Sequence, residues 1–123
     1  MARYLSDEWL GACQRALDAA GLGAPPAGAL VIEHAVGDVR YHVVLGDGRG
    51  AFRPGPAPSA PTATITADLA TAAAVFRGDT TARAAFLAGR LRVGGDLRSL
   101  ATATGTLAEL DDALAPVRAA TEA

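Results

Sequence analysis

The stretch Ala85-Phe86-Leu87-Ala88-Gly89-Arg90-Leu91-Arg92-Val93-Gly94-Gly95-Asp96-Leu97 decides the fold of this chain. It predicts a helix that ends at Gly89, because glycine readily adopts the left-handed conformation that closes helices. A short strand should follow and break at Gly94-Gly95. Asp96 can then cap a second helix. The stretch therefore predicts a helix, a strand and a helix joined by tight glycine turns.

The strand inside this stretch has two different faces. Side chains of a strand alternate, so Leu91 and Val93 share one face and Arg90 and Arg92 the other. With Arg98, these arginines form a small basic patch. Strand alternation alone explains the patch as a solvated face. An electrostatic contact with lipid headgroups or a partner protein is the alternative.

The rest of the chain predicts strands first and helices later. We expect a helix capped by Ser6 and ending near residue 20, and a final helix that starts at a capping box, Thr106 to Glu109. The other expected elements are strands over 29–36, 39–45, 49–53 and 62–66, and helices over 69–77, 80–87 and 97–103. Pro116 should kink or end the last helix. This order predicts a single α+β domain over 1–123, with a five-stranded mixed, mostly antiparallel sheet and helices packed on one face.

Composition favours an interior built from small side chains. Half of the 123 residues are hydrophobic, yet aromatic residues make up only 5% and there are 30 alanines. Small side chains fill space poorly, so a hollow interior is one explanation and a genome-wide bias toward alanine is the other. The net charge of −2 gives no overall attraction to nucleic acid.

Location and redox chemistry follow from what the sequence lacks. No apolar leader is visible at the N-terminus, and no apolar run reaches the roughly 20 residues of a membrane span. We therefore expect a cytoplasmic protein without stable membrane insertion. Cys13, the single cysteine, excludes an intrachain disulfide, and its place on an apolar helix face predicts a buried thiol.

The sequence contains no recognisable catalytic or metal-binding set. His34 and His42 fall on neighbouring strands, and no serine occurs in a nucleophile motif beside them. We expect both histidines on the exposed or half-exposed face of the sheet. One cysteine and two histidines are too few for a zinc site, so neither a metal nor a cofactor is expected.

Three segments resemble the sterol carrier protein 2 family, across roughly Gly28 to Leu110. They are Val43-Val44-Leu45-Gly46-Asp47-Gly48-Arg49-Gly50, Ala63-Thr64-Ile65-Thr66 with the helix ending at Arg77-Gly78-Asp79, and the opening stretch up to Asp96. The last is the most specific, since it is similar to the family's "AF-x-x-G-K-L-K-I-x-G-D" run with arginine at both lysine positions. The helices over 1–22 and 106–120 flank this family-like core.

The resemblance implies a non-enzymatic carrier. The family's fold encloses an apolar tunnel for lipids, fatty acyl chains, acyl-CoA or sterols, and transient contact with a membrane is compatible with that role. The residues expected to line the cavity are Tyr41, Val43, Phe52, Ile65, Phe76, Phe86, Leu87, Leu91, Val93, Leu107, Leu110 and Leu114. The helix over 69–76 departs from the family pattern in being mostly alanine, which reshapes the expected cavity, and the Trp9 helix precedes the match.

Two other functions remain open at this level. A small cyclase or isomerase could use the same pocket with one or two polar groups, taken from Tyr41, His34, His42 and Asp96. A cavity-less domain that binds a partner protein is the other. A buried polar residue with a perturbed pKa would favour the enzyme, and a filled interior would favour the partner-binding domain.

Overall fold

The computed structural model describes residues 2–20, 30–46, 49–58 and 60–122. Residue 29, expected in the first long strand, and Asp47-Gly48, part of a segment that resembles the family, lie outside these residues. The elements are β1 (Ala2–Arg3), α1 (Asp7–Ala20), β2 (Leu30–Val36), β3 (Val39–Gly46), β4 (Arg49–Pro54), β5 (Ala63–Ala67), α2 (Leu69–Arg77), α3 (Ala82–Leu87), β6 (Leu91–Gly95), α4 (Leu97–Thr102), α5 (Thr104–Ala113), α6 (Ala115–Ala119) and β7 (Thr121–Glu122).

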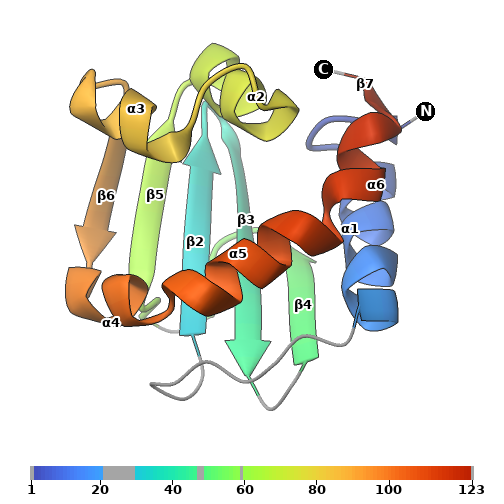
Figure 1. Ribbon diagram of the computed structural model, residues 1–123, viewed down its shortest axis with the longest axis horizontal. Coiled ribbons are helices and arrows are strands. Elements are labelled where there is room, and N and C mark those ends of the chain that lie inside the picture. Colours follow the sequence, from blue (N-terminus) through green and yellow to red (C-terminus); the bar gives the residue numbers. More distant parts are fainter. Residues whose placement is uncertain (1, 21–29, 47–48, 59, 123) are drawn as a thin grey trace.

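The main sheet has five strands in the order β4-β3-β2-β5-β6. Only the central pair β2–β5 is parallel, and its three other pairs are antiparallel. In Figure 1, α5 crosses the sheet over β2 and β3, α1 runs beside β4, and α2 and α3 lie at one end of the strands. The predicted α+β architecture, with a mixed and mostly antiparallel sheet, is therefore confirmed.

Side-chain caps fix four helix starts, two of them at the predicted caps Ser6 and Asp96. Ser6, Asp68, Thr81 and Asp96 each accept a hydrogen bond from the backbone N–H three residues later, at 3.1, 2.7, 3.0 and 3.1 Å. These bonds satisfy N–H groups that the first helical turn leaves unpaired. Gly89 has a φ of 75°, as expected for the residue that ends the turn after α3.

Strand β6 continues through Gly94-Gly95, so the predicted break there is wrong. Gly94 and Gly95 pair with Thr64 and Ala63 of β5. A Cβ on Gly95 would lie 2.6 Å from the Thr62 carbonyl oxygen, and its φ is +94°. The glycine therefore lets two backbones approach closely instead of ending the strand.

The predicted start of the last helix is also wrong, because α5 begins at Thr104. Thr106 lies inside the helix with 7% of its surface exposed, so it packs in the interior and does not cap. Ala103, which is 1% exposed, stands at the cap position without a side-chain bond. Pro116 ends the regular helix as expected and occupies the first turn of α6. The two-residue pair β1–β7 was not predicted.

The core lies between the sheet and the helices. It joins alternate residues of the central strands to one face of α1, with Trp9, Cys13 and Leu17 of the helix at most 2% exposed. Burial raises the pKa of the Cys13 thiol to about 12. The thiol is thus protonated at neutral pH, in agreement with the predicted buried position.

The outer face of the sheet is partly covered by the loop that follows β4. Ala57 N–H donates to Glu33 Oε1 at 2.9 Å, and Gly55 N–H donates to the Arg40 carbonyl at 2.9 Å. The His42 Nδ1 donates to the Gly55 carbonyl, also at 2.9 Å. His42 is therefore buried under this loop, contrary to the exposed position expected from its strand.

Candidate ligand-binding cavity

A cavity of about 200 Å³ lies between the inner face of the sheet and the helices. Strands β2, β3, β4, β5 and β6 form one wall, and α1, α2, α3, α5 and α6 form the other. The lining residues are Tyr4, Trp9, His34, Val36, Tyr41, Val43, Phe52, Ile65, Ala67, Ala72, Val75, Phe76, Ala82, Leu91, Leu110, Asp111, Leu114 and Arg118.

Eight of the twelve residues expected at the cavity line it in the structure. They are Tyr41, Val43, Phe52, Ile65, Phe76, Leu91, Leu110 and Leu114. The strand residues among them point inward because each is an alternate member of a strand whose other side chains face the loop or solvent. Of the other three, Phe76 lies on α2, Leu110 lies on α5, and Leu114 lies between α5 and α6.

The other four expected residues lie outside this lining. Phe86 and Leu87 are 47% and 72% exposed, because the short helix α3 buries Ala85 instead. Val93 and Leu107 are half-buried, and Leu107 packs against the core. The apolar side chains of Phe86 and Leu87 at the end of α3 therefore lie on the surface, which corrects the expectation that they form a cavity wall.

Aromatic side chains gather at one part of the cavity. Five of the six aromatic residues of the chain line it: Tyr4, Trp9, Tyr41, Phe52 and Phe76. The ring of Trp9 makes edge-to-face contacts with three of the others. Its centroid lies 5.0 Å from that of Tyr4, 5.6 Å from that of Tyr41 and 5.4 Å from that of Phe76. The buried Trp9 indole N–H has no hydrogen-bond partner among the described residues.

His34 faces the cavity, which corrects the expectation of an exposed histidine. It alternates with Ile32 and Val36 along β2, so strand parity in the sequence already contained this signal. Its ring stacks on Tyr41, the residue opposite it in β3, at 4.6 Å with an interplanar angle of 2°. Burial lowers the pKa of His34 to about 4 and raises that of Tyr41 well above its ordinary value.

An ion pair stands at the rim of the cavity, and sequence reasoning missed it. Arg118 Nη2 lies 2.7 Å from Asp111 Oδ1, and Arg118 Nε donates to the Phe76 carbonyl oxygen. The guanidinium group also lies over the Phe76 ring, 5.7 Å from its centroid. Arg118 therefore ties α6 to both α2 and α5 across the opening, through residues 42 and 7 positions away in the sequence.

Comparison with known proteins identifies the family. The model of the SCP-2 sterol transfer family matches residues 18–108. The chain belongs to this family. A conserved hypothetical protein from Thermus thermophilus shares 21% identity, with 95% of this chain and 91% of that one covered and a TM-score of 0.67. Sterol carrier protein 2 shares 21% identity over 94% and 98% of the two chains, with a TM-score of 0.66.

The same fold also occurs inside a larger enzyme. A stereoselective inverting sec-alkylsulfatase from Pseudomonas sp. shares 17% identity over 70% of this chain and 14% of its own, with a TM-score of 0.54. Likenesses at these identities show the fold alone. No curated protein sequence matches the chain significantly. Membership of the SCP-2 family thus supports lipid or sterol binding or transfer, without naming a ligand.

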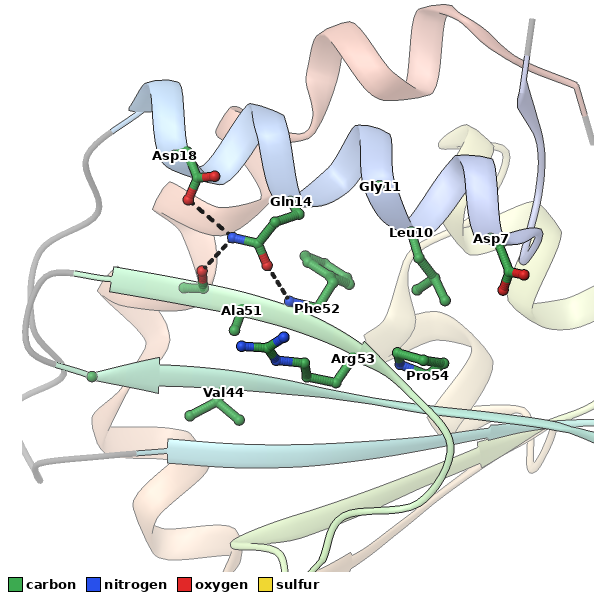
Figure 2. A pocket seen from close by; sticks show the side chains of 12 residues that line it. Asp7, Leu10, Gly11, Gln14, Asp18, Val44, Ala51, Phe52, Arg53 and Pro54 are labelled. Atoms are coloured by element: carbon green, nitrogen blue, oxygen red, sulfur yellow. Dashed lines mark hydrogen bonds between the residues drawn. The ribbon is translucent and has the colours of Figure 1, made fainter.

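A second hollow of this SCP-2 family member lies on another side of the molecule. It is a groove of about 820 Å³ between α1 and β4, with Asp7 and Asp18 among its lining residues. Figure 2 shows Gln14 reaching from α1 to the edge strand, where its Nε2 donates to the Gly50 carbonyl and its Oε1 accepts from Phe52 N–H, both at 2.9 Å. The groove is more open and more polar than the cavity, so the cavity is the stronger candidate site.

Metal binding and membrane spanning receive no support from the described part of the chain. No group of three or more histidine, cysteine, aspartate or glutamate side chains there could hold a metal ion. No described helix is both long and apolar enough to cross a bilayer. The arginines of the predicted basic patch, Arg90, Arg92 and Arg98, are all exposed, as strand alternation predicts for Arg92.

Proposed function

We propose that the chain binds and carries a hydrophobic small molecule in the cavity, without changing it chemically. The observation that carries this proposal is a hollow of about 200 Å³ with walls made mainly of carbon atoms, in the interior of an SCP-2 fold. Burying roughly 200 Å² of apolar ligand surface there would contribute about 5 kcal/mol. Such a gain supports useful binding without a charged anchor.

The size of the cavity limits what fits without rearrangement. Ligand pockets usually measure about 300–1,000 Å³, and a dry cavity of about 150 Å³ accepts benzene. The present cavity, at about 200 Å³, therefore suits a single ring with a short alkyl chain. A sterol exceeds this volume, so the cavity walls would have to move apart, and a separation of α2 from α6 would break the bond between Arg118 and the Phe76 carbonyl.

An enzymatic role finds one supporting observation, the stacked pair of half-buried His34 and buried Tyr41. Of the four polar candidates only these two line the cavity, since His42 binds the Gly55 carbonyl and Asp96 caps α4. General acid–base catalysis works best with a pKa near the working pH. Burial moves the pKa of His34 down to about 4 and that of Tyr41 up, in both cases away from neutrality. Carriage is therefore the better-supported function.

A partner-binding domain with a filled interior is less well supported, because the interior holds the cavity. Binding itself is tested by titration with a fluorescent fatty acid, followed by displacement with unlabelled lipids and sterols. Ala72→Phe should block binding because Ala72 lines the cavity. Ala70→Phe, an exposed position on the same helix, is the matched control and should bind normally.

The titration has a clear negative outcome. If no acyl chain, sterol or smaller apolar molecule binds saturably at micromolar concentration, the proposed function fails. Equal binding by both phenylalanine variants would place the ligand elsewhere on the chain. Circular dichroism of both variants shows whether each is folded before binding is compared.

A further inference from the structure

We propose that the cavity selects an alkyl-substituted ring that carries an uncharged oxygen, with the ring among the aromatic side chains and the alkyl chain along β5 and β6. Alkylphenols are the simplest members of this class. The inference rests on the proposed function, because it names the chemical class of the carried molecule. It follows from an uneven distribution of side chains around the cavity.

The cavity has an aromatic end and an aliphatic end. Tyr41 and Phe52 project from β3 and β4, on one side of β2, and they meet Trp9 of α1. On the other side of β2, the lining comes from Ile65 of β5 and Leu91 of β6. The strand order therefore places the lining rings of the sheet on one side of β2, together with Val43 of β3, and only aliphatic lining side chains on the other. A ligand with one ring and one saturated chain matches this division.

The aromatic end has unused hydrogen-bonding capacity. Trp9 is 1% exposed and its N–H has no partner among the described residues. No hydrogen bond joins the His34 or Tyr41 side chain to another described residue, but Trp9 Nε1 is the one buried side-chain polar atom left unpaired in the described part of the chain. Buried polar groups normally find partners, so an oxygen on the bound ring would satisfy groups that the protein leaves open.

The oxygen that fits this end is uncharged. The pKa of Tyr4 is raised to about 12, mainly by burial, and burial lowers that of His34 to about 4, so both side chains are neutral at pH 7. The one lining cation, Arg118, is already bound to Asp111 and to the Phe76 carbonyl at the rim. A carboxylate at the aromatic end would lose its hydration without gaining a charged partner, which disfavours simple fatty acids there.

The test compares three probes of similar size by isothermal titration calorimetry at pH 7: 4-hexylphenol, hexylbenzene and octanoate. We expect 4-hexylphenol to bind about tenfold more tightly than either of the others, as one satisfied hydrogen bond predicts. Quenching of Trp9, the only tryptophan, gives an independent reading on the unmodified protein. Phe86→Ala, an exposed position outside the cavity, should not change any of these affinities.

Two variants separate the oxygen contact from loss of the fold. Tyr41→Phe keeps the phenyl ring and removes its hydroxyl, whereas Trp9→Phe removes the indole N–H together with part of the ring. At least one of them should bring the ratio of 4-hexylphenol affinity to hexylbenzene affinity close to one, and a ratio unchanged in both folded variants would overturn the inference. Octanoate binding as tightly as 4-hexylphenol would overturn this inference and leave the carrier function standing. Failure of all three probes, and of the longer lipids above, would overturn both.

Discussion

Gly95→Ala should destabilise the protein strongly, whereas Gly94→Ala one residue earlier should not. A Cβ at position 95 would lie 2.6 Å from the Thr62 carbonyl oxygen and 2.9 Å from the Ala63 Cα, both of which are rigid backbone atoms. The added atom can be accommodated only if β5 and β6 move apart. At Gly94 no atom lies within 4 Å of the equivalent position.

The expected loss comes from two sources. A non-glycine residue held at a φ of +94° costs about 1–3 kcal/mol. The Thr62 carbonyl also accepts a 2.8 Å bond from the Asp96 N–H, and weakening it costs about 1 kcal/mol more. The total of about 2–4 kcal/mol corresponds to a melting temperature lower by roughly 8–15 °C for a chain of 123 residues.

Urea unfolding followed by tryptophan fluorescence measures this difference directly, because Trp9 is 1% exposed and is the only tryptophan. Gly94→Ala is expected to remain within about 1 kcal/mol of the parent, since alanine is no worse than glycine in a strand. If Gly95→Ala matched Gly94→Ala within 0.5 kcal/mol, which is roughly the resolution of such data, the proposed close approach of β5 and β6 would be refuted.

Three further outcomes are expected. The parent should lose about 3 kcal/mol of unfolding free energy as pH falls from 6.5 to about 4, because His34 becomes protonated in the unfolded chain but not in the folded protein. Urea titrations at several pH values measure this loss, and His34→Gln should remove the contribution of His34 to it. Arg118→Met should lower stability by about 1–2 kcal/mol, because the exposed pair with Asp111 contributes little and the part-buried bond to the Phe76 carbonyl contributes most, and it should speed ligand release in stopped-flow measurements. Native Cys13 should resist a thiol reagent at pH 8 and react fully in urea; rapid native reaction would contradict its burial.

Local signals in the sequence were sufficient for most element boundaries. Caps such as Ser6 and Asp96 act within one helical turn, and strand alternation separates Leu91, which is buried, from Arg92, which is exposed. Each of these features depends on neighbours in the sequence, so one chain without relatives contains the information. The same locality explains why the predicted fold was correct in outline.

Features set by distant contacts could not be predicted. Ala85 rather than Phe86 faces inward because of how α3 packs, and Gly95 is needed because of Thr62, 33 residues earlier in numbering. Arg118 contacts the Phe76 carbonyl because the fold brings α6 next to α2. Sequence periodicity describes the faces of one element and carries no information on which partner each face meets.

The alanine-rich helices answer a question that composition alone left open. A hollow of about 250 Å³ lies between α2 and α3 and is lined largely by alanines, among them Ala70, Ala74, Ala84 and Ala88. Short side chains on both helices therefore leave space between them instead of bringing them into full contact. The ligand-binding cavity between the sheet and the helices is also lined by the small side chains of Ala67, Ala72 and Ala82.

Gln14 has a consequence for the behaviour of the protein in concentrated solution. Its amide offers one donor and one acceptor to Gly50 and Phe52, as a backbone peptide of a neighbouring strand would (Figure 2). Sheet edges with unpaired backbone groups recruit strands from other molecules. By occupying this pair on β4, a single side chain removes a docking point for a second copy of the chain and so protects the sheet against growth from one molecule into the next.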